Sequence, residues 1–142
     1  MRARTWIAIV AVAIILAVGF ALKEYNRAPQ GAAAMDAVLT VQATELHAAF
    51  MADEAVARLN YVGEQEQAIV VEGVIREMEQ GDSGATVILE TADPVAGVVC
   101  EFAAGTVPAS WKPQARVRVQ GICTGVNDLI PDVIMMRCGA VE

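Results

Sequence analysis

Residues 68–78 read AIVVEGVIREM, and this stretch determines the expected architecture of the chain. The run is rich in Val and Ile, which favour strands, and Gly73 stands in its middle. A glycine inside a strand often marks a bulge or a sharp bend. The turn signal GDSG at residues 81–84 leads into a second apolar run over residues 85–90. We therefore expect a hairpin whose first strand bends.

Three further strands are predicted over residues 97–102, 115–123 and 132–140. Upstream of the strands, Leu46, Phe50, Ala57 and Tyr61 recur at helical spacing. One helix followed by five short strands, the first able to bend, predicts a mainly β fold. We expect a five-stranded OB-type Greek-key barrel preceded by a helix, because closing the barrel leaves no free sheet edge. An open antiparallel sheet covered by the helix is the alternative.

The N-terminal region has the features of a membrane-directed segment. Residues 6–22 carry no charge, which is short for a spanning helix of about 20 residues and long for the usual apolar region of a signal, about 7–15. An uncleaved anchor and a cleaved signal both stay open. Arg2 and Arg4 predict a cytoplasmic N-terminus and an extracytoplasmic remainder, single-pass at the cell membrane.

The predicted organisation has four parts. Residues 1–5 form the cytoplasmic N-terminus, residues 6–22 the anchor or signal, residues 23–42 a linker and residues 43–142 the OB-type domain. Within the linker, residues 26–36 are mostly small and include Pro29 and Gly31, which is typical of a flexible spacer.

Charge is unevenly distributed along the chain. The formal net charge is −7, but the first 27 residues hold four of the ten basic side chains and one of the seventeen acidic ones. The remaining residues therefore carry a net charge of −10. A domain of this charge repels phosphate polyanions and anionic lipid at long range, and favours cationic partners.

Several segments carry a family resemblance. They are residues 61–63 (YVG), 71–75 (VEGVI), 97–102 (GVVCEF), 117–125 (VRVQGICTG) and 132–134 (DVI), followed by Arg137-Cys138. In this order the chain resembles the bacterial OB-fold family described as tRNA-anticodon-domain-like, whose members are named as candidate nucleic-acid-binding lipoproteins. The resemblance covers about residues 43–141 and implies an OB barrel behind a leader. It implies no activity, because fold alone does not determine function, and the leader lacks the cysteine of a lipoprotein.

Three cysteines, Cys100, Cys123 and Cys138, follow the leader, and an extracytoplasmic compartment permits a disulfide. If strands 97–102 and 132–140 are parallel neighbours, as in OB barrels, Cys100 and Cys138 approach each other. Cys123 lies close to the turn before the last strand, so we expect its cross-strand neighbour near Val133. We predict a Cys100–Cys138 disulfide and a free Cys123.

Two candidate binding regions stand out. The first is the loop between the fourth and fifth strands, where apolar Leu129 and Ile130 sit in an expected turn beside Asn127 and Asp128. The second is a possible basic stripe on neighbouring strands, formed by Arg76, Arg116, Arg118 and Arg137. Ordinary cross-strand pairing with Glu72 and Glu77 is the structural alternative for these arginines.

We expect no metal site, cofactor or catalytic residues. His47 is the only histidine, the cysteines are widely spaced, and no nucleophile motif is present. Asn127, Asp128 and Asp132 could surround a calcium ion, but a β-turn uses the same residue types. The sequence favours a membrane-tethered extracytoplasmic binding module for protein or glycan over an enzyme. The alternative is a single-stranded nucleic-acid-binding OB protein, opposed by the charge and by the lack of a predicted aromatic platform.

Overall fold

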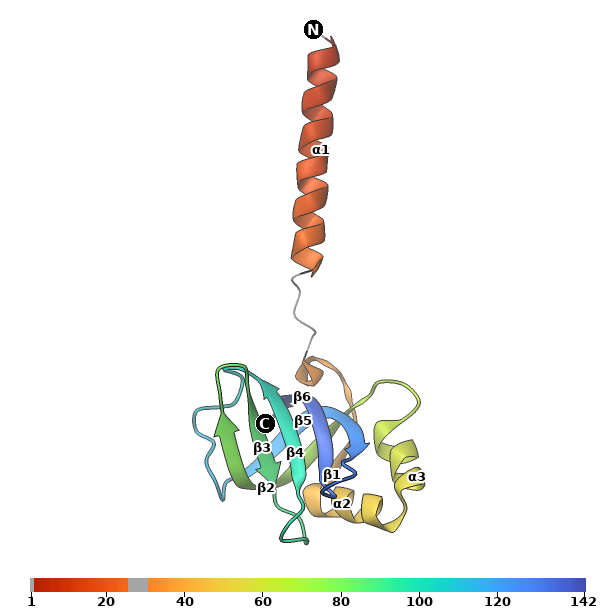
Figure 1. The fold of residues 1–142 in the computed structure, drawn as a ribbon, viewed down its shortest axis with the longest axis vertical. Helices are drawn as coiled ribbons and strands as arrows, with labels where there is room; N and C mark the ends of the chain where they lie inside the picture. Colours follow the sequence, from red (N-terminus) through yellow and green to blue (C-terminus); the bar gives the residue numbers. More distant parts are fainter. Residues whose placement is uncertain (1, 26–30) are drawn as a thin grey trace. The chain divides into compact units, whose positions relative to one another are not determined.

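The computed structural model describes residues 2–25 and 31–142, and the chain divides into two units, Met1–Gln30 and Gly31–Glu142. The first unit contains one helix, α1 (Arg2–Tyr25) (Figure 1). Its window Trp6–Lys23 has a mean hydropathy of 2.5 and buries none of its surface. Length and composition are sufficient to cross a membrane, although an N-terminal signal sequence has the same properties. Residues 26–30 of the predicted spacer lie outside the described residues.

The second unit is a barrel with a short helical segment (Figure 1). Its elements in chain order are η1 (Ala32–Ala34), β1 (Ala37–Gln42), α2 (Ala43–Ala52), α3 (Glu54–Ala57), the π-helical η2 (Arg58–Val62), β2 (Ala68–Gln80), β3 (Gly84–Leu89), β4 (Val98–Ala103), β5 (Arg116–Val126) and β6 (Val133–Ala140).

Strand pairing closes the barrel. β2 pairs antiparallel with β3 through its second half and with β5 through its first half, and β3 pairs antiparallel with β4. β4 pairs parallel with β6, which pairs antiparallel with β5. The result is a five-stranded closed mixed β-barrel preceded by helix, as the sequence predicted.

The N-terminal boundary of the barrel unit differs from the predicted one. The compact unit begins at Gly31, whereas residues 23–42 were assigned to a linker. Within that range β1 adds to β2 as a parallel strand, with Val41 opposite Val71. The side-chain amide of Gln120 donates to the carbonyls of Ala32 and Met35, which fastens η1 to β5. A buried polar side chain and a strand partner, both distant in sequence, thus order this segment.

β2 bends as expected, but Gly73 itself serves the packing of α2 and the register shift lies beyond it. A Cβ on Gly73 would lie 3.0 Å from the Cβ of Ala43, so its absence lets α2 pack directly on β2. The register of β2 against β3 shifts between Ile75 and Glu77, which bends the strand. The inward side chains of all five barrel strands, together with Leu46 and Phe50 of α2, form one core.

The β5–β6 register is close to the expected one. Cys123 lies opposite Met135, which is two residues from Val133 and three from Cys138, and Val126 is the partner of Val133. The register shifts between Cys123 and Gly125, where Gly125 has a φ of 118° and supports the Arg58 guanidinium. Glycine tolerates this backbone conformation, and the resulting bulge displaces every later pair.

Candidate binding surface

The β5–β6 loop exposes two apolar side chains at one end of the barrel. Leu129 is 92% exposed and Ile130 is 46% exposed, and both follow the exposed polar residues Asn127 and Asp128. All four predicted loop residues are therefore accessible. An aliphatic side chain as exposed as Leu129 gains almost no burial energy in the isolated protein.

Hydrogen bonds hold this loop in place. The Oδ1 of Asn127 accepts from the N–H of Leu129 at 2.9 Å, and the Oδ1 of Asp132 accepts from the N–H of Gly97 at 2.7 Å. Buried His47 of α2 lies with its Nε2 3.0 Å from the carbonyl oxygen of Pro131. The Asn127 and Asp132 oxygens thus serve the backbone, as the β-turn interpretation requires.

A second loop, residues 91–96, lies beside the first and is also held by hydrogen bonds. Arg76 donates from Nη1 to the carbonyl of Ala96 at 3.1 Å and from Nη2 to that of Asp93 at 2.9 Å. Hydrogen bonds from the N–H groups of Val95 and Ala96 hold the pKa of the Asp93 carboxyl below its usual value. The loop displays Val95, which is 75% exposed. We call residues 91–96 and 127–132 together the loop end.

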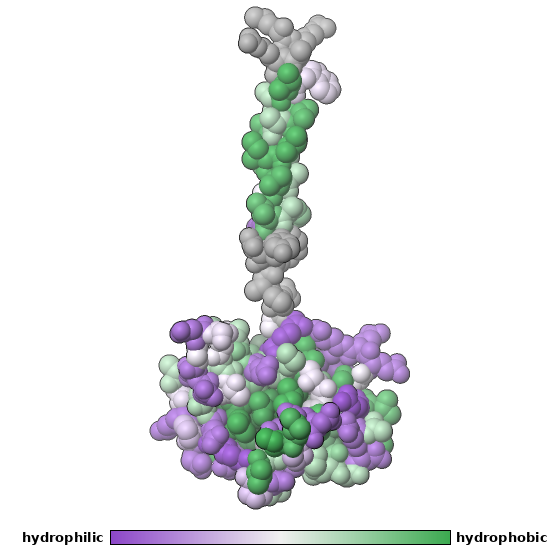
Figure 2. Space-filling model, in the orientation of Figure 1, coloured by the Kyte–Doolittle hydropathy of each residue, from purple (hydrophilic) through white to green (hydrophobic). Residues whose placement is uncertain are grey.

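The outer face of β3, β4 and β6 is apolar where it meets the loop end. Ile88 lies opposite Val99, and Val99 lies opposite Ile134, so three outward β-branched side chains form a row across three strands. Met136, 43% exposed, lies two residues further along β6. We call Ile88, Val99, Ile134 and Met136 the apolar sheet face, and Figure 2 shows hydrophobic surface in the middle of the barrel.

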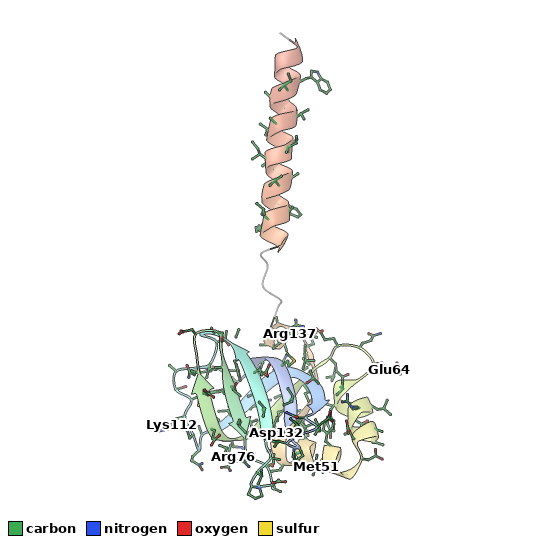
Figure 3. The ribbon with its side chains drawn as sticks, in the orientation of Figure 1. Met51, Glu64, Arg76, Lys112, Asp132 and Arg137 are labelled. Carbon is green, nitrogen blue, oxygen red and sulfur yellow. The ribbon has the colours of Figure 1, made fainter. Side chains whose placement is uncertain are left out.

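The four predicted arginines do not lie together. Figure 3 shows Arg76 and Arg137 at opposite ends of the barrel. Arg76 holds the 91–96 loop, and Arg137 pairs with Glu66 at 2.5 Å. Arg116 and Arg118 are neighbours on β5, where Arg116 donates to Gln42 Oε1 and Arg118 pairs with Glu72 at 2.9 Å. Each arginine thus has a local partner.

The three cysteines are buried free thiols. A hydrogen bond with Cys138, followed by burial, raises the pKa of the Cys100 thiol, so these two side chains are in contact. Burial raises the pKa of the Cys123 thiol to about 11. The parallel pairing of β4 with β6 brings Cys100 and Cys138 together as expected, and the disulfide between them stays a prediction that non-reducing peptide mapping tests.

Aromatic side chains of the barrel unit pack inward. Phe50 and Tyr61 lie with ring centroids 6.2 Å apart, and Phe102 meets Trp111 edge to face at 5.8 Å. No aromatic residue in the described part of the barrel unit lies on the apolar sheet face. Among the described residues, no group of three or more metal-ligating side chains comes together.

Ile88, Val99 and Ile134 were not among the predicted binding residues, although Ile134 continues the row of the other two. The signal was available in the parity of the last strand, since Ile134 alternates with buried Val133 and Met135. Val95 was missed because nothing local predicts that Arg76 would order its loop.

Comparisons with known proteins found the following similarities. The chain is similar to a lipoprotein from Klebsiella pneumoniae whose name proposes nucleic-acid binding, at 14% identity over 72% of this chain and 91% of that chain, with a TM-score of 0.50. It is also similar to a protein from Leishmania major Friedlin named as a candidate aspartyl-tRNA synthetase, at 14% identity over 72% of this chain and 20% of that chain, with a TM-score of 0.46.

A replication protein A heterotrimer bound to single-stranded DNA shows a more distant likeness, with 12% identity over 56% of this chain and 62% of that chain and a TM-score of 0.39. No curated protein matches the chain. The sequence model of the family described as tRNA_anti-like matches residues 1–139, which is nearly the whole length. With this match and the closed OB-like barrel, the chain belongs to the tRNA_anti-like family.

Proposed function

We propose that this protein is a membrane-tethered OB module that binds a protein partner outside the cytoplasm through the loop end. The observation that carries the proposal is the exposure of Leu129, Ile130 and Val95 together on loops that are fixed by hydrogen bonds. Surface aliphatic residues that are held in place and gathered in one patch are typical of interaction sites.

The geometry favours a protein over a glycan or a nucleic acid. Aliphatic side chains gain free energy by being buried against other apolar groups, at about 25 cal/mol per Å². Sugar and phosphate groups offer little such surface. In OB folds the loop between the last two strands commonly contributes to ligand contact, and this loop occupies that position here.

The location outside the cytoplasm rests on α1 and on its flanking charge. Arg2 and Arg4 precede the apolar window Trp6–Lys23, and positively charged flanks usually stay in the cytoplasm. A reporter enzyme that works only outside the cytoplasm should therefore be active when it is fused after residue 142. A reporter that works only in the cytoplasm should be inactive at the same position. The opposite pattern of activity would contradict this topology.

A photoreactive amino acid incorporated at position 129 of the full chain tests the binding site in cells. The matched control is position 59, because Leu59 is 68% exposed and belongs to η2, outside the loop end. We expect ultraviolet-dependent protein adducts from position 129 and not from position 59. Equal adducts from both positions, or none from position 129, would count against the loop end.

Single-stranded nucleic acid is the second candidate, since the family and the Klebsiella relative suggest it. The region best suited to phosphate is an open groove of about 360 Å³ beside Trp111, Arg116 and Arg118. A photoreactive residue at position 116 separates the candidates, because nuclease-sensitive adducts there would favour nucleic acid.

A further inference from the structure

We infer that the apolar sheet face takes a cationic, apolar segment of the partner protein, one in which Lys or Arg side chains flank aliphatic ones. This inference rests on the proposed function and names the chemistry of its partner. It is drawn from the sheet face and from the acidic side chains around it.

The apolar sheet face is continuous with the loop end. Val99 follows Gly97 by two residues on the same side of the sheet, and the N–H of Gly97 bonds to Asp132 of the loop end. A Cβ on Gly97 would lie 2.7 Å from the Cγ2 of Ile88, so Ile88 extends across the position where a side chain would otherwise stand. One ligand can therefore contact the row of Ile88, Val99 and Ile134 and the apolar loop tips together.

Acidic side chains border this row. Glu77 lies opposite Ile88 on the neighbouring strand, and the next row places Glu79 and Glu101 on either side of Thr86. Glu77, Glu79, Thr86 and Ile88 line an open groove of about 450 Å³. None of the three glutamates forms an ion pair within the described residues of the chain.

The nearest base forms no ion pair with these acids and can offset at most one of their three charges. Arg76 also lines the groove, but its guanidinium donates to two backbone carbonyls of the 91–96 loop. Glu77 and Glu79 stand two residues apart on β2 and Glu101 stands two strands away on β4, so these like charges repel one another across the groove. A cationic ligand relieves this repulsion, whereas a polyanion adds to it, so the charge pattern selects the sign of the ligand.

The test uses the full chain in nanodiscs of zwitterionic phosphatidylcholine, with empty nanodiscs as the blank. Three fluorescein-labelled short peptides serve as probes: alternating Lys and Leu, alternating Glu and Leu, and alternating Lys and Ser. Fluorescence anisotropy is measured at about 0.15 M salt, where surface charges more than about 8 Å apart are screened. We expect saturable binding only for the Lys–Leu peptide, weakening as salt rises.

Two variants locate the binding. The triple variant Glu77→Gln, Glu79→Gln, Glu101→Gln should weaken Lys–Leu binding at least about tenfold, as loss of a main contact does. The control Asp36→Asn, Glu64→Gln, Glu142→Gln makes the same charge change at exposed positions elsewhere and should have little effect. Val99→Ser should also weaken binding about tenfold, compared with Leu59→Ser. Circular dichroism checks that each variant is folded.

The outcomes are distinguishable. Equal binding of the Glu–Leu peptide, or unchanged binding by the folded triple Gln variant, would overturn the inference. If the Lys–Leu peptide fails to bind while photo-adducts from position 129 persist, the inference is overturned and the proposed function stands. Loss of both would overturn both.

Discussion

On β5 the outward Arg116 and Arg118 each have a partner, whereas Glu77 and Glu79 of β2 and Glu101 of β4 have none among the described residues. The β2–β5 surface uses its charges within the fold, because Glu72 stands directly opposite Arg118. The apolar sheet face, by contrast, has half-buried Ile88, Val99 and Ile134 beside exposed acids that the fold does not pair. Unpaired charged side chains beside apolar surface indicate a place where a bound partner can add stability. Charged side chains that are paired within the fold do not.

The largest expected effect concerns the backbone under the apolar sheet face. In Gly97→Ala the new Cβ would stand 2.7 Å from Ile88 Cγ2 and 2.8 Å from the Leu89 carbonyl oxygen. We expect a loss of about 1–3 kcal/mol in the free energy of unfolding, as overpacking usually costs. Gly81→Ala is the control, because its Cβ has no neighbour nearer than 3.7 Å. Equal denaturation midpoints for the two variants would contradict the described packing.

A second prediction concerns the pH dependence of stability and rests on Cys123 of β5. Burial raises the pKa of Cys123 from 9.0 to about 11. The unfolded chain therefore releases this proton first, so stability is full below about pH 9 and falls as pH rises towards 11. By pH 10 the loss from this group should reach about 1.4 kcal/mol.

The measurement is urea unfolding at pH 8 and pH 10 in the presence of a reductant, with Cys123→Ala for comparison. The variant lacks the titrating thiol and should lose less stability between the two pH values than the wild type. If the two proteins lose equal stability, Cys123 is not buried as described.

The third prediction compares a paired with an unpaired acid. Glu72 accepts from Gln42 at 2.8 Å and pairs with Arg118, and its side chain is 25% exposed. Glu72→Ala should lower the free energy of unfolding by about 1 kcal/mol, a typical value for a partly exposed charged hydrogen bond. Glu101→Ala should change it by less than about 0.5 kcal/mol. Chemical denaturation gives both values, and a larger cost at Glu101 would mean that this acid has a structural partner.

The barrel could be predicted because its signals are local: a bend-permitting Gly73, five apolar runs and turn residues between them. β1 was not predicted, although Val38, Thr40 and Val41 are β-branched. The mostly small residues before it favoured a linker over residues 23–42. Its order depends on distant partners, with β2 beside it and Gln120 holding η1.

The candidate site was only partly predictable. The exposure of Leu129 and Ile130 follows from their place in a turn, but the hydrogen bonds that anchor that turn come from His47 and Gly97, each many residues away. The arginines illustrate the same limit. The alternation of apolar and polar residues predicts that the arginines point outward from their strands. Only the register of β2 against β5 shows that Glu72 stands opposite Arg118.

The most direct test of the central claim is an anisotropy titration of the full chain with a mixed-sequence single-stranded oligonucleotide at about 0.15 M salt. The barrel unit carries a net charge of −10, and the arginines of β5 are paired within the fold. The account predicts no saturable binding by the wild type. Tight, salt-sensitive binding that Arg116→Ala, Arg118→Ala abolishes would contradict it and would make nucleic acid the ligand of this barrel.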